Sequence, residues 1–427
     1  MNRVLIGDVK NNAEKSILLE GRVHNIRKLG KISFLILEDR TGEIQTVWDS
    51  HIDARVGDIV GIDGIVKEDK RAKSGYEIQG KKLKLISESH IELPYDMSKH
   101  DLDLNLSTLL DNRVLTVRHP KVKAIFKLYD ILLKSYETVM REEGFTEIKT
   151  PKLLASLTEG GANFFKVKYF NDEAFLAQSP QFYKQIMVGA FERVFEIAPI
   201  FRAEPHFTTR HLNEYIGFDA EMGFIKNDED VRNELNIVLK KMFQIIEHDG
   251  KEHLDYFGIE LDKVPDKIPS ITLSDAKTII KDKYNYTVPS TTDIDPEGER
   301  LVCKYAREEL NSEFIFVTHY PWSDRPFYTM PADDKQKDTL GFDLLYKNME
   351  IVTGGQRIHS FEMLIENMKR KKINPEGMEY YLDTFKSGMP PHGGWGLGSE
   401  RLLQLILNLQ SIKEASLFPR DVKRLIP

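Results

Sequence analysis

The sequence is poor in cysteine and has no long apolar run. One cysteine, Cys303, stands among 427 residues, which excludes a disulfide framework and a cysteine-based zinc site. No stretch approaches the ~20 consecutive apolar residues that a membrane-spanning helix needs. Residues 1–12 mix polar and apolar side chains without the order of a secretory signal. We therefore expect a soluble, cytoplasmic protein with no membrane partner.

A surplus of positive charge is also missing. The chain has 60 Lys and Arg against 67 Asp and Glu, a net charge of -7, which argues against a general nucleic-acid binder. The charge is uneven, because residues 1–100 hold 17 basic and 16 acidic residues and the remainder carries -8. With 41% hydrophobic and 30% charged residues the composition is globular, and the length predicts two or three domains.

The N-terminal part predicts a small barrel. Five segments between residues 17 and 90 are rich in β-branched and aromatic residues and are separated by turn residues. Five short strands without a long helix favour an OB-fold, whose surface suits single-stranded nucleic acid. We assign residues 1–95 to this domain.

The rest of the chain predicts a linker and a larger α+β domain. Residues 96–120 show no sustained periodicity and are assigned to a linker or hinge. Apolar residues recur at helical spacing over 121–143, which predicts an amphipathic helix. Strands and helices then mix without regular alternation through residues 121–427, which favours an antiparallel sheet with helices.

Residues 201–215 form a polar loop between two predicted strands and carry more charge than a turn needs. Arg202 and Arg210 are permanent cations whose forked donors suit phosphate oxygens. Glu204 can accept a hydrogen bond from an exocyclic amine, and Tyr215 offers a stacking face. The loop therefore predicts nucleotide binding.

Residues 393–401 read GGWGLGSER and precede an apolar helix. They form neither a P-loop, because lysine is missing before the serine, nor a dinucleotide fingerprint. Arg401 in the first helical turn opposes the helix dipole, which indicates a role outside the helix, such as binding a nucleotide phosphate. Upstream, Glu350 and Thr353 supply oxygen ligands that suit Mg²⁺, and Arg357 suits a carboxylate.

These segments, in this order, resemble the three motifs of class II aminoacyl-tRNA synthetases. Residues 144–151 (GFTEIKTP) resemble motif 1, residues 201–215 motif 2, and residues 396–401 motif 3. The N-terminal barrel is typical of the class IIb (Asp/Asn/Lys) subgroup, and the chain most resembles archaeal-type aspartyl-tRNA synthetases over nearly its whole length. The resemblance implies a catalytic domain built on an antiparallel β-sheet flanked by helices, Mg²⁺ as cofactor, ATP and L-aspartate as substrates, and a homodimer.

Residues 178–185 (QSPQFYKQ) resemble the aspartyl pattern Q-S-P-Q-x-Y-K-Q, in which the lysine binds the substrate's side-chain carboxylate. A buried cation without a matching anion penalises the amide of asparagine. Residues 158–161 resemble a mobile loop that closes on the amino acid. The resemblance implies that aspartate is bound by Glu159, Gln181, Lys184, Asp219, Thr353 and Arg357.

The same resemblance assigns the ATP site and the chemistry. Arg202 neutralises the α-phosphate, adenine lies between Tyr215 and Arg401, and Glu350 and Thr353 hold Mg²⁺. Arg202, Glu350 and Arg401 are the catalytic residues, and positioning with charge neutralisation replaces general acid–base catalysis. The expected ATP-binding residues are Arg202, Glu204, Arg210, His211, Leu212, Tyr215, Glu350, Gly398 and Arg401.

The barrel is expected to read the tRNA anticodon. Phe34, Gln45 and Glu77 match the family's stacking and hydrogen-bonding positions. His24 in one loop and Gly80 in another match enzymes that charge both tRNA-Asp and tRNA-Asn, whereas Trp and Lys are typical of enzymes restricted to tRNA-Asp. The sequence thus favours a non-discriminating enzyme, with an amidotransferase as a downstream partner.

Four alternatives stay open. The first is a discriminating aspartyl-tRNA synthetase, and the second is an asparaginyl-tRNA synthetase, against which Lys184 and Phe418 argue. The third is an asparagine synthetase of synthetase descent, which the intact barrel disfavours. The fourth is an inactive RNA-binding protein on the same fold, which the intact catalytic residues disfavour.

Overall fold

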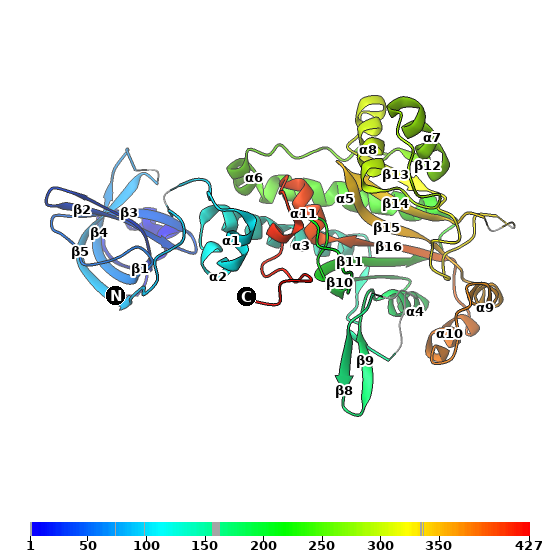
Figure 1. Ribbon diagram of the computed structural model, residues 1–427. Helices are drawn as coiled ribbons and strands as arrows, with labels where there is room; N and C mark the ends of the chain where they lie inside the picture. Colours follow the sequence, from blue (N-terminus) through cyan, green and yellow to red (C-terminus); the bar gives the residue numbers. More distant parts are fainter. Residues whose placement is uncertain (1, 73, 98, 156–162, 334, 336) are drawn as a thin grey trace. The chain divides into compact units, whose positions relative to one another are not determined.

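The computed structural model describes residues 2–427 except 73, 98, 156–162, 334 and 336 (Figure 1). The chain divides into two compact units, Met1–Val122 and Lys123–Pro427. No helix among these described residues is both long enough and apolar enough to cross a membrane.

The first unit is built on the closed five-stranded barrel that the sequence predicted, and its strand order is β1-β2-β3-β5-β4. Alternate side chains point inward and form one apolar core, because successive residues of a strand face opposite sides. A short 3₁₀ helix, η1 (Ile6–Asn12), precedes the barrel. The strands are β1 (Ser16–Leu29), β2 (Ile32–Asp39), β3 (Gly42–Trp48), β4 (Ile59–Glu68) and β5 (Tyr76–Ser87).

The segment predicted as a linker contains two short helices, α1 (Leu106–Asp111) and α2 (Arg113–Thr116). Asn105 begins α1 by accepting a hydrogen bond from the backbone N–H of Thr108 with its side chain, a standard N-cap. Helices of this length are too short to give the periodicity that sequence analysis detects.

The second unit contains an eight-stranded sheet with the order β12-β13-β14-β15-β16-β11-β10-β6, which is antiparallel apart from its two edge pairs. A smaller sheet has the order β7-β9-β8. The strands are β6 (Thr146–Glu147), β7 (Leu153–Leu154), β8 (Lys166–Tyr169), β9 (Asp172–Leu176), β10 (Arg193–Phe201), β11 (Glu214–Gly223), β12 (Ser270–Thr272), β13 (Phe314–Thr318), β14 (Gly341–Tyr346), β15 (Met349–Arg357) and β16 (His392–Gly398).

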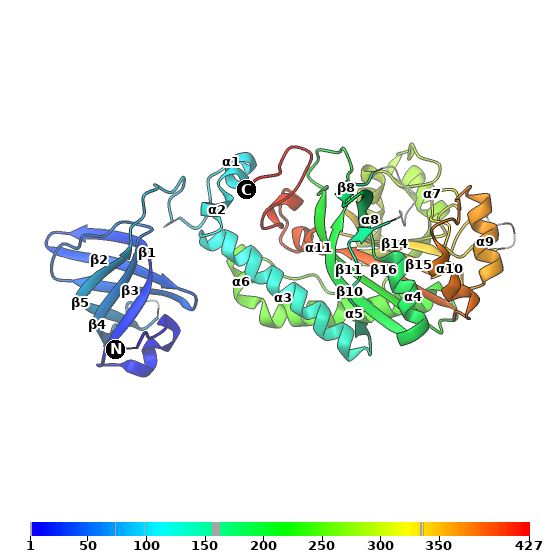
Figure 2. The ribbon, with the colours of Figure 1, turned by 90° about the horizontal axis from the view of Figure 1, so that it is seen from below.

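Helices α3 and α5 cover one face of the large sheet, while α7 and α8 pack on β13 and β14 from the other face (Figures 1 and 2). The main core joins α3, α5 and α11 to inward residues of β11, β15 and β16. The predicted helix over 121–143 is observed as α3. The helices are α3 (Pro120–Glu142), α4 (Gln181–Phe191), α5 (Asp228–Asp249), α6 (Lys251–Phe257), α7 (Leu273–Tyr284), α8 (Pro296–Leu310), α9 (Phe361–Arg370), α10 (Glu379–Lys386), α11 (Ser399–Ile406) and the 3₁₀ helix η2 (Ile412–Glu414).

Candidate active site

The opposite face of the large sheet lines a cavity. On β11, Phe218 and Ala220 point into the core, whereas Tyr215, Gly217 and Asp219 line the cavity. This alternation follows from the two-residue period of a strand. The predicted motif 2 loop joins β10 to β11, and α4 lies against both strands, so motif 2 and the QSPQFYKQ segment meet at one site.

β16 uses glycine on its cavity side. Trp395 and Leu397 belong to the core, while Gly396 and Gly398 line the cavity. A Cβ added at Gly396 would lie 3.4 Å from Asp219 Oδ1. The glycine-rich motif therefore keeps the cavity open instead of forming a phosphate-binding loop.

Lys184 lies at one end of the cavity and is only 2% exposed. Its Nζ donates to Asp219 Oδ1 and to the backbone oxygen of Trp395, both at 2.9 Å. A second carboxylate oxygen, Glu221 Oε2, lies 3.5 Å from the same Nζ. A buried cation is tolerated here because carboxylates and a carbonyl replace its water.

Arg357 enters the same end of the cavity from β15. Its Nε donates to Glu221 Oε1 at 2.9 Å, and its Nη2 donates to the backbone oxygen of Gly394 at 3.1 Å. Gln181 also lines the cavity, and its buried Nε2 has no hydrogen-bond partner. Two cations and an unsatisfied amide donor suit a ligand that carries a carboxylate.

The other end of the cavity carries the motif 2 residues. The Arg202 guanidinium lies 5.9 Å from the centre of the Tyr215 ring. Glu204 Oε2 lies 3.7 Å from His211 Nε2, and burial holds the pKa of His211 below its ordinary value. At neutral pH His211 is therefore a hydrogen-bonding group and adds no charge to the site.

Two acidic residues position the arginines. Glu299 of α8 pairs with Arg210 and accepts a hydrogen bond from the backbone N–H of Glu350 at 3.2 Å. Arg401 donates to the backbone oxygen of Glu350 at 2.8 Å. Arg210 and Arg401, which lie far apart in the sequence, are thus tied to the same residue of β15.

Oxygen atoms that can ligate a metal ion lie close together around Glu350. Thr353 Oγ1 donates to Glu350 Oε1 at 2.9 Å, and Asp343 pairs with Thr353 in the strand register. Asp343 Oδ2 accepts from Arg325 at 2.6 Å, but its buried Oδ1 has no partner. Burial, together with the Asp343 charge, raises the pKa of Glu350 to about 7. Crowded carboxylates with one orphan oxygen fit a hard cation such as Mg²⁺.

The structure brings together every predicted amino-acid and ATP residue that it describes. Glu159, together with the rest of the predicted loop 158–161, lies outside the described residues. The cavity is lined by Gln181, Lys184, Arg202, Glu204, Arg210, His211, Leu212, Tyr215, Asp219, Glu350, Thr353, Arg357, Gly398 and Arg401.

Sequence analysis missed Glu221, Glu299, Asp343 and Glu400. Glu400 accepts hydrogen bonds from the backbone N–H of Ile216 with both carboxylate oxygens, at 3.1 and 3.0 Å. For Glu221 a signal existed, because a glutamate two residues after Asp219 on a strand must share its face. Nothing local marks Glu299, which reaches the site only through the tertiary fold.

Three predicted anticodon residues share the outer face of the barrel. Phe34, Gln45 and Glu77 are half-buried on strands whose neighbouring residues point inward. Gln45 Nε2 donates to Glu77 Oε2 at 3.3 Å, and Arg27 donates to Gln45 Oε1 at 3.4 Å. An aromatic ring beside a series of hydrogen-bonded polar side chains fits the recognition of unpaired bases.

The expectation that His24 and Gly80 lie in loops was wrong, because both residues lie inside strands, His24 within β1 and Gly80 within β5. His24 occupies a β-bulge between Val23 and Asn25, and a second bulge follows Gly80. A Cβ added at Gly80 would lie 2.4 Å from Trp48 Cε2, so glycine here has a packing reason of its own.

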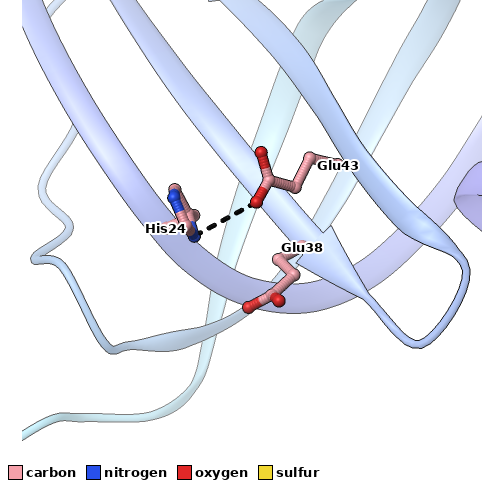
Figure 3. A group of neighbouring side chains, drawn as sticks. All are labelled: His24, Glu38 and Glu43. Atoms are coloured by element: carbon pink, nitrogen blue, oxygen red, sulfur yellow. Dashed lines mark ion pairs between the residues drawn. The ribbon is translucent and has the colours of Figure 1, made fainter. Parts of the chain in front are cut away.

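His24 is 6% exposed and faces two glutamates (Figure 3). Its Nδ1 lies 3.4 Å from Glu43 Oε1 and makes no hydrogen bond. Among the described residues, His24, Glu38 and Glu43 form the one group of at least three His, Cys or acidic side chains close enough to share a metal ion, with ligand atoms within 4.8 Å of one another.

Comparison with known families gives the class. Residues 105–422 match the family of class II tRNA synthetases for D, K and N, and residues 17–86 match the OB-fold nucleic acid binding domain. The chain belongs to the class II tRNA synthetases of this group.

Within that class its relatives are aspartate–tRNA ligases. It is 41% identical to the aspartate–tRNA(Asp/Asn) ligase of Deinococcus radiodurans, with 100% of this chain and 99% of the relative covered. It is 43% identical to the aspartate–tRNA(Asp) ligase of Pyrococcus furiosus, with 97% and 96% covered.

Solved structures share the fold. A crystal structure of asparaginyl-tRNA synthetase from Pyrococcus horikoshii, complexed with asparaginyl-adenylate, matches with a TM-score of 0.91 at 29% identity and covers 100% of both chains. A putative aspartyl-tRNA synthetase from Leishmania major matches with a TM-score of 0.89 at 27% identity, covering 100% of this chain and 95% of the other. The fold therefore does not choose between aspartate and asparagine.

Proposed function

We propose that the protein is an aspartate–tRNA ligase that activates L-aspartate with ATP and transfers it to tRNA-Asp and tRNA-Asn. The observation that carries the amino-acid choice is Lys184, a cation buried beside Arg357 in the cavity. An aspartate side chain supplies the anion that such a site binds, and asparagine does not. The relatives named aspartate–tRNA ligases support the same choice.

In the proposed reaction the α-carboxylate oxygen of aspartate attacks the α-phosphorus of ATP, and pyrophosphate leaves. Arg202 neutralises the α-phosphate, and Tyr215 with Arg401 holds adenine. A terminal ribose hydroxyl of tRNA then attacks the aspartyl carbonyl and releases AMP. The chain contributes alignment and fixed positive charge instead of an acid or base.

Glu350 and Thr353, with Asp343 beside them, would hold Mg²⁺. Bound there, the ion would supply charge neutralisation for the phosphates. Glu350 and Asp343 repel each other when both are ionised, so a bound cation lowers the cost of that repulsion.

The tRNA range is the finer part of the proposal. His24 and Gly80 match the relaxed pattern, while relatives of both kinds are about equally identical to this chain. Because overall identity does not decide, the proposal rests on these two positions. A cytoplasmic homodimer and a downstream amidotransferase complete it.

The test is charging of purified tRNA-Asp and tRNA-Asn transcripts with radiolabelled aspartate, with asparagine in parallel. We expect aspartate on both tRNAs and no transfer of asparagine. Charging of tRNA-Asp alone would contradict the relaxed range but keep the enzyme. Transfer of asparagine would overturn the amino-acid assignment.

A further inference from the structure

Four charged side chains meet at the amino-acid end of the cavity. Lys184 comes from α4 and Arg357 from β15, while Asp219 and Glu221 stand two residues apart on β11. Each cation touches Glu221, and Lys184 also touches Asp219. The cluster is electrically balanced before any substrate binds.

The two carboxylates differ in access. Asp219 lines the cavity, whereas Glu221 is 0% exposed and is not part of the lining. Glu221 therefore contacts the two cations on their side away from the cavity and cannot touch a ligand bound in the cavity. Its pKa is raised by burial, but Arg357 and Lys184 outweigh burial and hold it below the ordinary value, so Glu221 carries a full charge.

The backbone is shaped to admit this carboxylate. A Cβ added at Gly394 would lie 2.0 Å from the backbone oxygen of Ala220 and 2.4 Å from Glu221 Oε2, so only glycine leaves room for β11 and this carboxylate. His392 and Tyr381 also surround Glu221, and both are buried. Burial lowers the pKa of His392 to about 4, so His392 is neutral and adds no competing charge.

We propose that Glu221 is a positioning residue for amino-acid selection, which holds Lys184 and Arg357 at the place where the substrate's side-chain carboxylate binds. This inference rests on the proposed aspartate activation. On binding, the substrate carboxylate replaces Asp219 at Lys184, and Asp219 takes the substrate ammonium. Glu221 keeps its place throughout, so neither cation moves when the ion pairs exchange.

The experiment is aspartate-dependent ATP–pyrophosphate exchange with the full-length protein, measuring KM for aspartate and for ATP separately. Glu221→Gln keeps the shape and removes the charge. We expect its KM for aspartate to rise at least about tenfold while its KM for ATP changes less than about twofold. Glu221→Asp keeps the charge, so its KM for aspartate should fall between those of Glu221→Gln and the wild type.

Glu196→Gln is the matched control. Glu196 is also a buried glutamate of the large sheet with a lysine partner, Lys152 at 3.0 Å, but it lies outside the cavity lining. We expect Glu196→Gln to leave the ratio of the two KM values unchanged. If Glu221→Gln does not fold, Glu221→Asp carries the test, with KM for aspartate raised and KM for ATP kept.

Two results would overturn the inference alone. The first is an unchanged KM for aspartate in Glu221→Gln. The second is a rise of KM for aspartate that is matched by an equal rise of KM for ATP, in Glu221→Gln and in Glu196→Gln alike. If the wild type does not activate aspartate at all, the proposed function fails and the inference with it.

Discussion

Lys184 shows how a single residue acquires a role from its partners. A lysine on an amphipathic helix is ordinarily solvated, and only the surrounding octet of the sequence pointed to a buried one. The contacts that make burial possible come from residues 35 and 211 positions further along the chain. The sequence predicted that Lys184 binds a carboxylate of the substrate. It did not predict that Lys184 donates a hydrogen bond to Asp219 when no substrate is bound.

Removing this cation tests the amino-acid assignment directly. In Lys184→Met we expect kcat/KM for aspartate to fall by at least about 100-fold, because truncating one partner of a buried charge pair costs roughly 2–5 kcal/mol. Pyrophosphate exchange measures it. Lys152→Met removes a lysine paired to Glu196 and should leave kcat/KM within about threefold, because neither residue lines the cavity. Equal losses in both variants would contradict the assignment.

At the scale of elements, the strand–helix junction from β16 into α11 links both walls of the proposed adenine site. Glu400 at the start of α11 binds the backbone of Ile216, the neighbour of Tyr215, and stands next to Arg401. The sequence predicted the apolar helix that follows the glycine-rich residues. It did not predict the bond between Glu400 and Ile216, because the two partners are 184 residues apart.

The protonation of Glu400 gives this junction a pH dependence. Burial raises the pKa of Glu400 to about 7, so the folded protein favours the protonated carboxyl. The contribution of this group to the free energy of unfolding is fully present below its pKa in the unfolded chain, and it is lost as pH rises through about 7. Glu400→Gln removes this loss. The melting temperature of the variant minus that of the wild type should therefore increase from pH 5 to pH 8, as measured by calorimetry.

The control for this prediction is Glu252→Gln, which changes an exposed glutamate in the first turn of α6. Its melting-temperature difference from the wild type should not change with pH over the same range. A Glu400→Gln curve parallel to that of the wild type would contradict the raised pKa.

The barrel strands illustrate the reach of pattern reasoning for elements. Segments rich in β-branched and aromatic residues, separated by turn residues, identified all five strands and the closed barrel, but they did not predict the strand order. The sequence did not predict the β-bulges at His24 and after Gly80, because a β-bulge adds one residue and shifts the two-residue period locally. Such shifts depend on the partner strand and leave no mark in one sequence.

At the scale of the whole molecule, the residues of the proposed aspartate and ATP site and the predicted anticodon residues lie in different units. The cavity residues all belong to Lys123–Pro427, whereas the predicted anticodon residues all belong to Met1–Val122. The barrel also carries exposed lysines on β5, including Lys82. Binding of tRNA to the barrel and activation of the amino acid should therefore respond to different substitutions.

Lys82→Met separates the two activities. We expect weaker tRNA binding and a slope of log K against log salt that is smaller by about 1, if this lysine neutralises one phosphate. Aspartate-dependent pyrophosphate exchange should be unchanged, because it takes place without tRNA in the other unit. Lys283→Met, on α7 of the other unit, is the matched control for tRNA binding, and a change of exchange rate in Lys82→Met would contradict the division.

The contact between Gly80 and Trp48 has an evolutionary consequence. A lysine at position 80 would place its Cβ 2.4 Å from Trp48 Cε2, so the indole must move or be replaced when that substitution occurs. The effect of a substitution at position 80 therefore depends on the residue at position 48. We therefore expect that residue 48 and its packing change together with residue 80 wherever this barrel adopts the lysine that the resemblance links to enzymes restricted to tRNA-Asp.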